Sequence, residues 1–322
     1  AAEHRQRMQH LSAEECERAC QFMTIISFNA VLQSPELDEG EGRGWRTVIG
    51  LSLLKTASKA THSCLPNAVW YTRDALGTQV MRSITHISAG EEIFINYLSD
   101  DDLLLPTEER QELLQKSKDF NCSCPRCSAE EDDTRVFPCF RSQCLGSWHV
   151  CRSGSSKCNT CKRVVQKKDV QAALDKEATL KKRIQHINYV SSRGLRILVQ
   201  PEALGLKPLH PHHYLTFKLA RLQSEVHCEF GNYSKAAGLL KTLVDCCTNL
   251  QALRISRTTA SAFERLGDML QCAGELGQAR SAYESARDVH MLVQESSHPN
   301  VVSCEQRLQD VQRRLSKDVG SR

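Results

Sequence analysis

The sequence has no run of about 18 apolar residues, so no membrane-spanning helix is expected. It also lacks a charged and then apolar leader resembling a signal peptide. Its net charge is only +4, from 42 Lys or Arg against 38 Asp or Glu, which gives no bulk argument for nucleic-acid or membrane binding. These absences favour an ordinary soluble globular protein of the cytoplasm, the nucleus or both.

Cysteine is abundant, and its distribution is informative. Sixteen cysteines would suit a secreted disulfide scaffold, but eight of them fall into short, metal-type spacings at Cys64 and between Cys122 and Cys161. The others, apart from Cys151, are scattered through sequence that looks helical. This pattern predicts a reducing compartment in which clustered thiolates bind metal and the remaining thiols are buried.

The order of local patterns predicts the α+β class, in two or three compact units for 322 residues. A helical start is followed by a loop rich in Pro, Gly and acidic residues, then by short strands with β-branched residues, and then by a short helix that opens at Pro106. The ranges are helix 1–33, loop 34–44, strands 47–54, 68–72, 79–84 and 92–97, and helix 106–118. From Lys167 onward apolar residues recur at helical spacing.

A repeated segment lies within this helical part. Gly231-Asn232-Tyr233-Ser234-Lys235-Ala236 and Gly274-Glu275-Leu276-Gly277-Gln278-Ala279 stand 43 residues apart. A glycine that ends one helix and an alanine that packs early in the next are what a stacked helix-turn-helix array needs. We therefore predict a TPR-like array with lengthened helices, and the alternative is an irregular helical bundle.

Two cysteine patterns predict structural zinc sites, about two ions per chain. Cys122-x-Cys124-x-x-Cys127 supplies three thiolates, and zinc takes four tetrahedral ligands. The pairs Cys139-x4-Cys144 and Cys158-x2-Cys161 resemble a zinc ribbon, in which His149 or Cys151 could substitute for one ligand. Four protein ligands leave no open position for water, so this zinc would be structural.

Three motifs in order carry a family resemblance: Thr61-His62-Ser63-Cys64-Leu65-Pro66-Asn67, Gly90-Glu91-Glu92-Ile93-Phe94-Ile95-Asn96-Tyr97 and Cys122-Ser123-Cys124-Pro125-Arg126-Cys127. They resemble the C-terminal half of a SET domain with its post-SET segment, and are most similar to the SET-and-MYND (SMYD) branch. The resemblance implies transfer of a methyl group from S-adenosylmethionine to a lysine of a protein substrate. It also implies that Cys64 is the fourth ligand of the first zinc ion.

The resemblance assigns roles to single residues. It implies that Tyr97 is the catalytic residue and that it also faces the cofactor. Contacts with S-adenosylmethionine are implied for His62, Phe120, Thr61 and Asn29, although Ile26 is an alternative register for the last. The family has an asparagine where this chain has Thr61, and Thr offers one hydroxyl in place of a carboxamide. If that side chain contacts the cofactor, affinity is expected to fall.

The domain order that follows is a C-terminal SET half (1–105), a post-SET zinc segment (106–130), a zinc-ribbon-like insert (131–166) and a TPR-like helical domain (167–322). Gly42-Arg43-Gly44 lies too close to His62 to be the SET cofactor loop, so we interpret it as a turn into the last SET strands. We expect the cofactor loop upstream of Ala1. The chain alone is then expected to show neither measurable cofactor binding nor methyl transfer.

Two other functional classes stay open. A zinc-stabilised scaffold that has lost methyl transfer is favoured by Thr61 and by the expected absence of the opening loop, and a protein partner could occupy the groove of the helical domain. Nucleic-acid binding through the ribbon depends on Lys162-Arg163 and Lys167-Lys168 alone. Such charge pairs are usually a solvated face, so nucleic acid is not expected as a partner.

Overall fold

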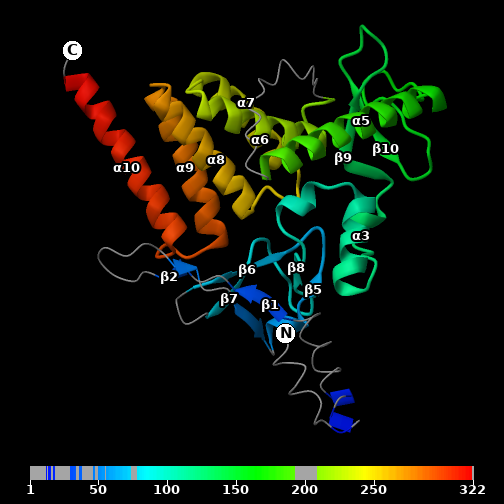
Figure 1. Cartoon of the computed structure of the whole chain (residues 1–322), viewed down its shortest axis with the longest axis horizontal. Helices are drawn as coiled ribbons and strands as arrows, with labels where there is room; N and C mark the ends of the chain where they lie inside the picture. The colour runs from blue at the N-terminus through cyan, green and yellow to red at the C-terminus, as the bar shows by residue number, and fades with distance from the viewer. Residues whose placement is uncertain are drawn as a thin grey trace.

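The protein is represented by a computed structural model, which describes residues 12, 14–15, 17–18, 30–33, 36–37, 46–47, 50–54, 56–73, 78–192 and 209–320. Short strands occupy the first part of the chain and helices fill the last part, as the α+β prediction required (Figure 1). Within the described ranges no helix has both the length and the hydropathy to cross a bilayer.

The strands pair two by two. Antiparallel pairs join β1 (Ala30–Gln33) to β4 (Gly50–Leu53), β2 (Glu36–Leu37) to β3 (Arg46–Thr47), and β6 (Ala68–Thr72) to β7 (Gln79–Ser83). A parallel pair joins β5 (Thr61–His62) to β8 (Phe94–Ile95), two segments separated by the β6–β7 hairpin. This parallel pairing positions the second sequence motif beside the first.

Three sequence-based boundaries were wrong. The predicted helix 1–33 ends in strand β1, although the described residues at 14, 15, 17 and 18 are helical. The predicted loop 34–44 contains β2, and the predicted strand 47–54 is divided between β3 and β4. In each case pairing with a distant strand overrides local preference, which a single sequence does not reveal.

The middle of the chain follows the predictions more closely. A 3-10 turn (Asp101–Leu104) leads into α3 (Thr107–Lys118), which begins directly after Pro106. Helix α3 ends at Asp119, whose φ of 58° is left-handed and stops the helix before the cysteine motif. A short helix α4 (Pro125–Ser128) and the hairpin of β9 (Glu131–Pro138) with β10 (Ser147–Cys151) complete this region.

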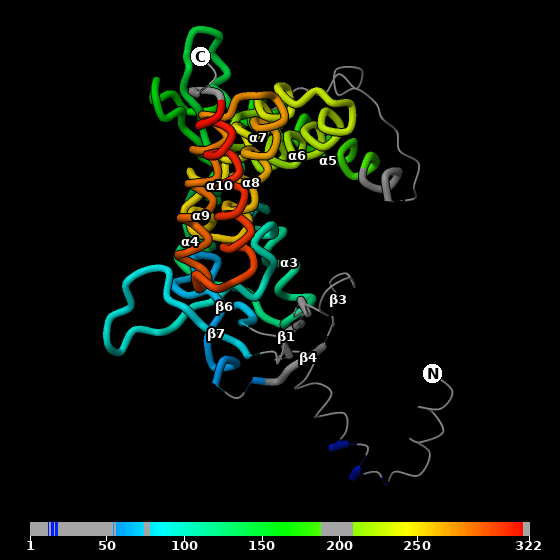
Figure 2. The backbone as a smooth tube through the Cα atoms, turned by 90° about the vertical axis from the view of Figure 1, so that its left-hand side faces the viewer, coloured from blue at the N-terminus to red at the C-terminus, as the bar shows by residue number. Residues whose placement is uncertain are grey.

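Within residues 167–192 and 209–320 the structure describes six helices, and each one from α6 onward packs against its neighbour in sequence (Figure 2). The first of them begins at the predicted Lys167. They are α5 (Lys167–Ser192), α6 (Tyr214–Glu229), α7 (Tyr233–Asn249), α8 (Arg257–Cys272), α9 (Leu276–Val293) and α10 (Pro299–Gly320). This serial stacking is the arrangement of a TPR-like array.

The repeated segments have the predicted structural roles. Gly231 and Gly274 follow α6 and α8 with φ of 72° and 80°, a left-handed conformation that favours glycine at a helix end. Ala236 and Ala279 are fully buried in the first turns of α7 and α9. The two hairpins are therefore copies of one packing unit.

The helices meet the strand region at two places. Near the start of the array, the Asp101 carboxylate accepts hydrogen bonds from Arg221 of α6 (2.6 Å) and from the hydroxyl of Thr258 of α8 (3.0 Å). The largest core cluster also continues from Cys64, Cys122 and Cys127 through Leu103 and Leu114 into α6–α10. Strand region and helices thus share one core.

The second meeting point lies at the turn between α9 and α10. Arg73, which follows β6, forms an ion pair with Glu295 of that turn, and Arg82 of β7 donates to the carbonyl of Gln294 at 2.6 Å. Figure 1 shows this turn above the ends of β6 and β7. The helical array therefore touches the strands at both of its ends.

Candidate functional site

Three of the residues expected at the methyl-transfer site form one aromatic cluster. The His62 ring lies 5.4 Å from the ring of Tyr97 and 5.9 Å from that of Phe120, and Tyr97 and Phe120 meet edge to face at 6.4 Å. The parallel pairing of β5 with β8 sets His62 opposite Ile95, two residues before Tyr97. The chain returns to this place after α3, which delivers Phe120.

His62 connects this cluster to the cysteines. Its Nδ1 accepts a hydrogen bond from the Tyr97 backbone N–H (3.0 Å), and its Nε2 lies 3.4 Å from the Cys64 sulfur. Burial lowers the pKa of His62 to about 4, so the ring is neutral at pH 7. Because Nδ1 accepts, the single ring proton is on Nε2 and points at the sulfur. This is the orientation that stabilises a thiolate.

Tyr97 is held through its hydroxyl as well as its backbone. The hydroxyl donates to the carbonyl of Ala60 at 2.5 Å, and the ammonium of Lys118 lies 5.8 Å from the ring centroid. Burial, with a smaller contribution from the Glu92 carboxylate, raises the pKa of Tyr97. The phenol therefore stays protonated at neutral pH. Because its proton is donated to Ala60, its oxygen can act toward a ligand as a hydrogen-bond acceptor.

Asn67, the last residue of the first motif, fixes the strand that carries Tyr97. Its Oδ1 accepts from the Phe94 N–H (2.8 Å) and its Nδ2 donates to the Glu92 carbonyl (2.9 Å). The Asn67 N–H donates in turn to the Phe94 carbonyl at 3.1 Å. A buried carboxamide that is satisfied on both sides holds β8 in register.

Thr61 is placed differently from the other predicted contacts. It is exposed, on the face of β5 opposite to His62, and its hydroxyl donates to the Glu92 carboxylate. The structure thus separates Thr61 from the aromatic cluster by the alternation of the strand. Asn29 and Gly42-Arg43-Gly44 lie outside the described residues, and their assignments stay predictions.

Asn96 belongs to the second motif, but the family resemblance assigned it no role. Its Oδ1 accepts from the Leu98 N–H (3.0 Å), but its Nδ2 is buried and has no hydrogen-bond partner within the described part of the chain. A buried amide donor without a partner costs about 1–3 kcal/mol. This donor, in the residue before Tyr97, fits a site that a polar cofactor completes.

The four predicted ligands of the first zinc ion converge. The sulfurs of Cys64, Cys122, Cys124 and Cys127 all lie within 4.8 Å of one another, and the Cys64 and Cys127 sulfurs are 3.5 Å apart. A tetrahedron with Zn–S bonds of about 2.3 Å has sulfur–sulfur edges of roughly 3.8 Å. The cluster therefore fits a zinc ion, which would join the SET region to the post-SET segment.

A fully buried arginine adjoins this cluster, and no sequence motif indicated it. Arg110 of α3 donates to the Leu105 carbonyl and to the Thr107 hydroxyl (3.1 Å), and its Nη2 lies 3.6 Å from the Cys127 sulfur. Burial alone would lower the pKa of Arg110, but the sulfurs of Cys64 and Cys127 raise it. The guanidinium thus compensates the negative charge of the thiolates.

The second cluster contains the four cysteines of the predicted ribbon. The Cys139 and Cys161 sulfurs lie 3.9 Å apart and those of Cys144 and Cys158 lie 3.8 Å apart, again close to tetrahedral edges. A Cβ at Gly146 would lie 2.7 Å from the Cys158 sulfur, so this loop needs glycine.

The two alternative ligands are engaged elsewhere. The ring of His149 pairs with the Glu131 carboxylate (3.2 Å), and the Cys151 thiol donates to the His149 carbonyl (3.6 Å). Neither belongs to the group of converging sulfurs. The four cysteines are therefore the ligand set that the geometry supports.

Comparisons with known proteins agree with the motifs. Residues 5–98 match the family model described as SET domain. Over 85 residues the chain is 34% identical to N-lysine methyltransferase SMYD2-B of Xenopus laevis, 34% to SMYD2 of Gallus gallus and 33% to SMYD2 of Homo sapiens.

The extent of these matches is limited. Each alignment covers 26% of this chain and 18–19% of the relative, so the chain spans about a fifth of the length of the relatives it matches. Over that stretch, the family model, the relatives and the observed geometry all agree with the resemblance predicted from the motifs. The chain therefore contains a SET domain related to those of the SET-and-MYND lysine methyltransferases.

Proposed function

We propose that the protein transfers methyl groups from S-adenosylmethionine to lysine side chains of other proteins. The observation that supports this best is the cluster of His62, Tyr97 and Phe120 at the junction between the SET strands and the first cysteine cluster. The relatives named N-lysine methyltransferases are similar over the same region. Reduced, metal-binding cysteines suit the cytoplasm or the nucleus as the location.

Tyr97 would orient the substrate amine. Its one hydroxyl proton is committed to the Ala60 carbonyl, so the oxygen can accept a hydrogen bond from the N–H of a neutral lysine. That contact aims the nitrogen lone pair away from the phenol and toward the electrophile. Alignment of this kind supplies much of the rate in a displacement that needs no protein nucleophile.

The neighbouring residues would hold the reactants. Phe120 offers an aromatic face and Asn96 a buried amide donor to the cofactor, and the neutral His62 keeps Tyr97 in place through its backbone. When bound, S-adenosylmethionine supplies an electrophilic methyl carbon. The Glu92 carboxylate, close enough to raise the pKa of Tyr97, would attract a basic substrate segment.

The test is Tyr97→Phe in the protein that carries this chain. Methyl transfer from tritiated S-adenosylmethionine to a mixture of proteins should fall at least about 100-fold, because only the orienting hydroxyl is lost. Tyr233→Phe, at a half-buried tyrosine on α7, is the matched control and should leave transfer unchanged. Equal transfer by Tyr97→Phe and the parent would contradict the catalytic assignment.

The position of Thr61 favours the second candidate, a zinc-stabilised scaffold without catalysis. Its side chain is directed at Glu92 rather than at the aromatic cluster, where the family has an asparagine. Titration calorimetry with S-adenosylmethionine separates the two functions. Binding by the parent that strengthens in Thr61→Asn supports an enzyme with a weakened contact. Absence of binding in both proteins supports the scaffold.

A further inference from the structure

Positive charge is concentrated in one part of the sequence. The thirty residues from Cys139 to Lys168 contain seven Lys or Arg and no Asp or Glu. The rest of the chain then holds 35 basic against 38 acidic residues, because the totals are 42 and 38. The small net charge of the chain therefore conceals a basic segment inside an acidic remainder.

The structure gathers this charge at one end of the ribbon, in residues 139–146 and 157–168, which we call the ribbon tip. Its two loops are joined by the cysteine sulfurs, and the antiparallel bridge of Lys157 with Val164 closes the second loop on itself. Six exposed cations belong to it, and within the described residues none of them forms an ion pair: Arg141, Lys157, Lys162, Arg163, Lys167 and Lys168.

Asp169 directly follows the ribbon tip and offsets one of its six cations, but the nearest run of acidic residues does not reach the tip. It lies at the base of the hairpin, where Glu131 stands opposite Cys151, whereas Pro138 and Ser147 pair at the tip end. Seven steps along β9 correspond to roughly 23 Å. This is well beyond the Debye length of about 8 Å at physiological ionic strength, so the tip acts as a separate positive surface.

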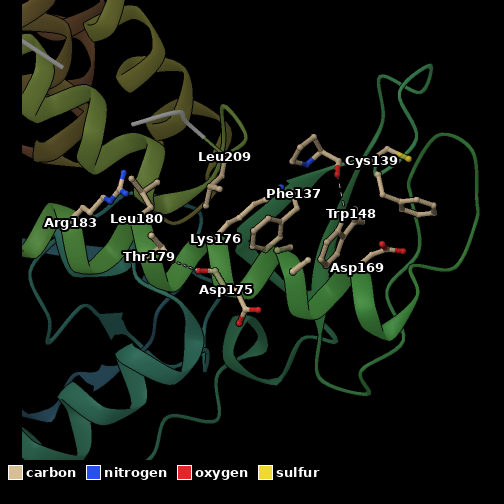
Figure 3. A pocket seen from close by; sticks show the side chains of 14 residues that line it. Phe137, Cys139, Trp148, Asp169, Asp175, Lys176, Thr179, Leu180, Arg183 and Leu209 are labelled. Atoms are coloured by element: carbon tan, nitrogen blue, oxygen red, sulfur yellow. Dashed lines mark hydrogen bonds between the residues drawn. The ribbon is translucent and has the colours of Figure 1, made fainter. Parts of the chain in front are cut away.

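A hollow of about 740 Å³ adjoins the ribbon tip, between the hairpin and α5 (Figure 3). On the hairpin side Phe137 and Trp148 stack at 4.9 Å, and Phe140, 43% exposed, stands at its edge. On the helix side Asp169 lines the hollow, with its carboxylate on the side of Trp148. Because Phe137 and Trp148 are buried, Phe140 provides the exposed aromatic surface of the hollow, and Asp169 provides a hydrogen-bond acceptor.

We propose that the ribbon tip binds single-stranded nucleic acid. Its phosphates would lie along the six cations, while one unpaired base stacks on Phe140 and enters the hollow, where the Asp169 carboxylate can accept from its amino group. Stacking platforms beside a basic track are the usual means of binding single strands. A duplex keeps its bases inside, so it is disfavoured.

Fluorescence anisotropy with a labelled 20-nucleotide single strand, as DNA and as RNA, tests the proposal on the zinc-loaded chain. Log affinity should fall linearly with log salt concentration, with a slope of up to about −4 for six phosphate contacts. Lys162→Gln with Arg163→Gln should weaken binding and reduce the slope by about 1.4. Phe140→Ser should weaken binding about tenfold without changing the slope.

The control is Lys116→Gln with Lys235→Gln, which removes two exposed lysines from α3 and α7. It should leave affinity and slope unchanged, and zinc content should be the same in all variants. No binding at low salt, or equal losses in the tip and control variants, would refute the proposal. So would tighter binding to duplex DNA. Binding only to phosphatidylserine vesicles would also refute it, if that binding is abolished by Leu145→Ser, a change at a fully exposed apolar residue of the ribbon tip.

Discussion

The two tetracysteine clusters have the same donor atoms but different places in the fold. The first combines Cys64 with three cysteines that begin 58 positions later, and three of its four ligands are buried. The second draws all its ligands from residues 139–161, and only Cys158 is buried. A metal that closes a long loop inside a core constrains far more of the chain than one that closes a short loop at the surface.

The surroundings of the two clusters also differ, since the first lies in the core and the second at the surface. The first cluster adjoins the buried Arg110 and the His62 ring and belongs to the core that continues into the helices. The second holds two loops together at the surface, among exposed basic residues. The same zinc chemistry would therefore support global stability at the first cluster and the shape of a local surface at the second.

Cys64→Ser should have the largest effect. Loss of one ligand should release about one of two zinc ions and remove the link between the SET strands and the post-SET segment, because such binding energy is also folding energy. Chemical denaturation should show the strand region and α3 unfolding at much lower denaturant. The control Cys272→Ser changes an exposed thiol of α8 and should leave both zinc content and unfolding unchanged.

Arg110→Met tests the charge beside the first cluster. The change keeps the volume but removes the guanidinium, so zinc affinity, measured by competition with a chromophoric chelator, should fall about 10- to 100-fold. Lys116→Met, on the exposed face of the same helix, is the control and should keep the parent affinity. Unchanged affinity in Arg110→Met would mean that the thiolates need no compensating charge.

Glu177→Gln tests what attaches the hairpin to α5. Glu177 is buried and accepts two hydrogen bonds from Arg135 of β9 (3.1 and 2.6 Å), while the His213 ring nitrogen lies 3.4 Å away. The variant should lose about 2–3 kcal/mol of unfolding free energy at pH 7. Lys176→Gln, one residue earlier on the exposed side of α5, should lose much less.

The loss of unfolding free energy in Glu177→Gln should become smaller as the pH falls. Burial alone would raise the pKa of Glu177, but His213 and Arg135 lower it below its usual value of 4.5. A carboxylate with a lowered pKa contributes stability above pH 4.5 that is lost as the pH falls through the folded-state pKa. The parent and Glu177→Gln should therefore converge in acid. A constant difference down to pH 3 would contradict the assignment.

Cys161→Ser should have the smallest effect on stability. It should also release about one zinc ion, yet shift the unfolding midpoint of the main transition little, because the ribbon ligands close a short surface loop. Hydrogen exchange should rise in residues 139–165 alone. A loss of stability as large as that of Cys64→Ser would show that the two clusters are equivalent.

The sequence predicted the features that depend on local spacing. The cysteine patterns, the helix after Pro106 and the glycines that end α6 and α8 all encode a structure within a few residues. The roles proposed for Tyr97 and His62 came from family motifs, and the geometry places the two residues together.

Features that depend on pairing over long distances were missed. Strand β1 forms because of β4, and a single sequence does not show which segments meet. Arg110 and Asn96 look like any polar residue of an amphipathic helix or a short strand. Their burial beside the sulfurs and beside Tyr97 appears only when distant segments pack together.

The contact of the α9–α10 turn with β6 and β7 has a mechanical consequence. The chain leaves the strand region near Asp101 and runs through the helices, and the α9–α10 turn then contacts the strand region again at Arg73 and Arg82. The helices are therefore attached to the strand region at two points and not at one. A protein whose helices are attached at two points resists bending when force is applied. Pulled by an optical trap from Ser12 to Lys317, it should first lengthen by a short, reversible step as the ion pair at Glu295 ruptures.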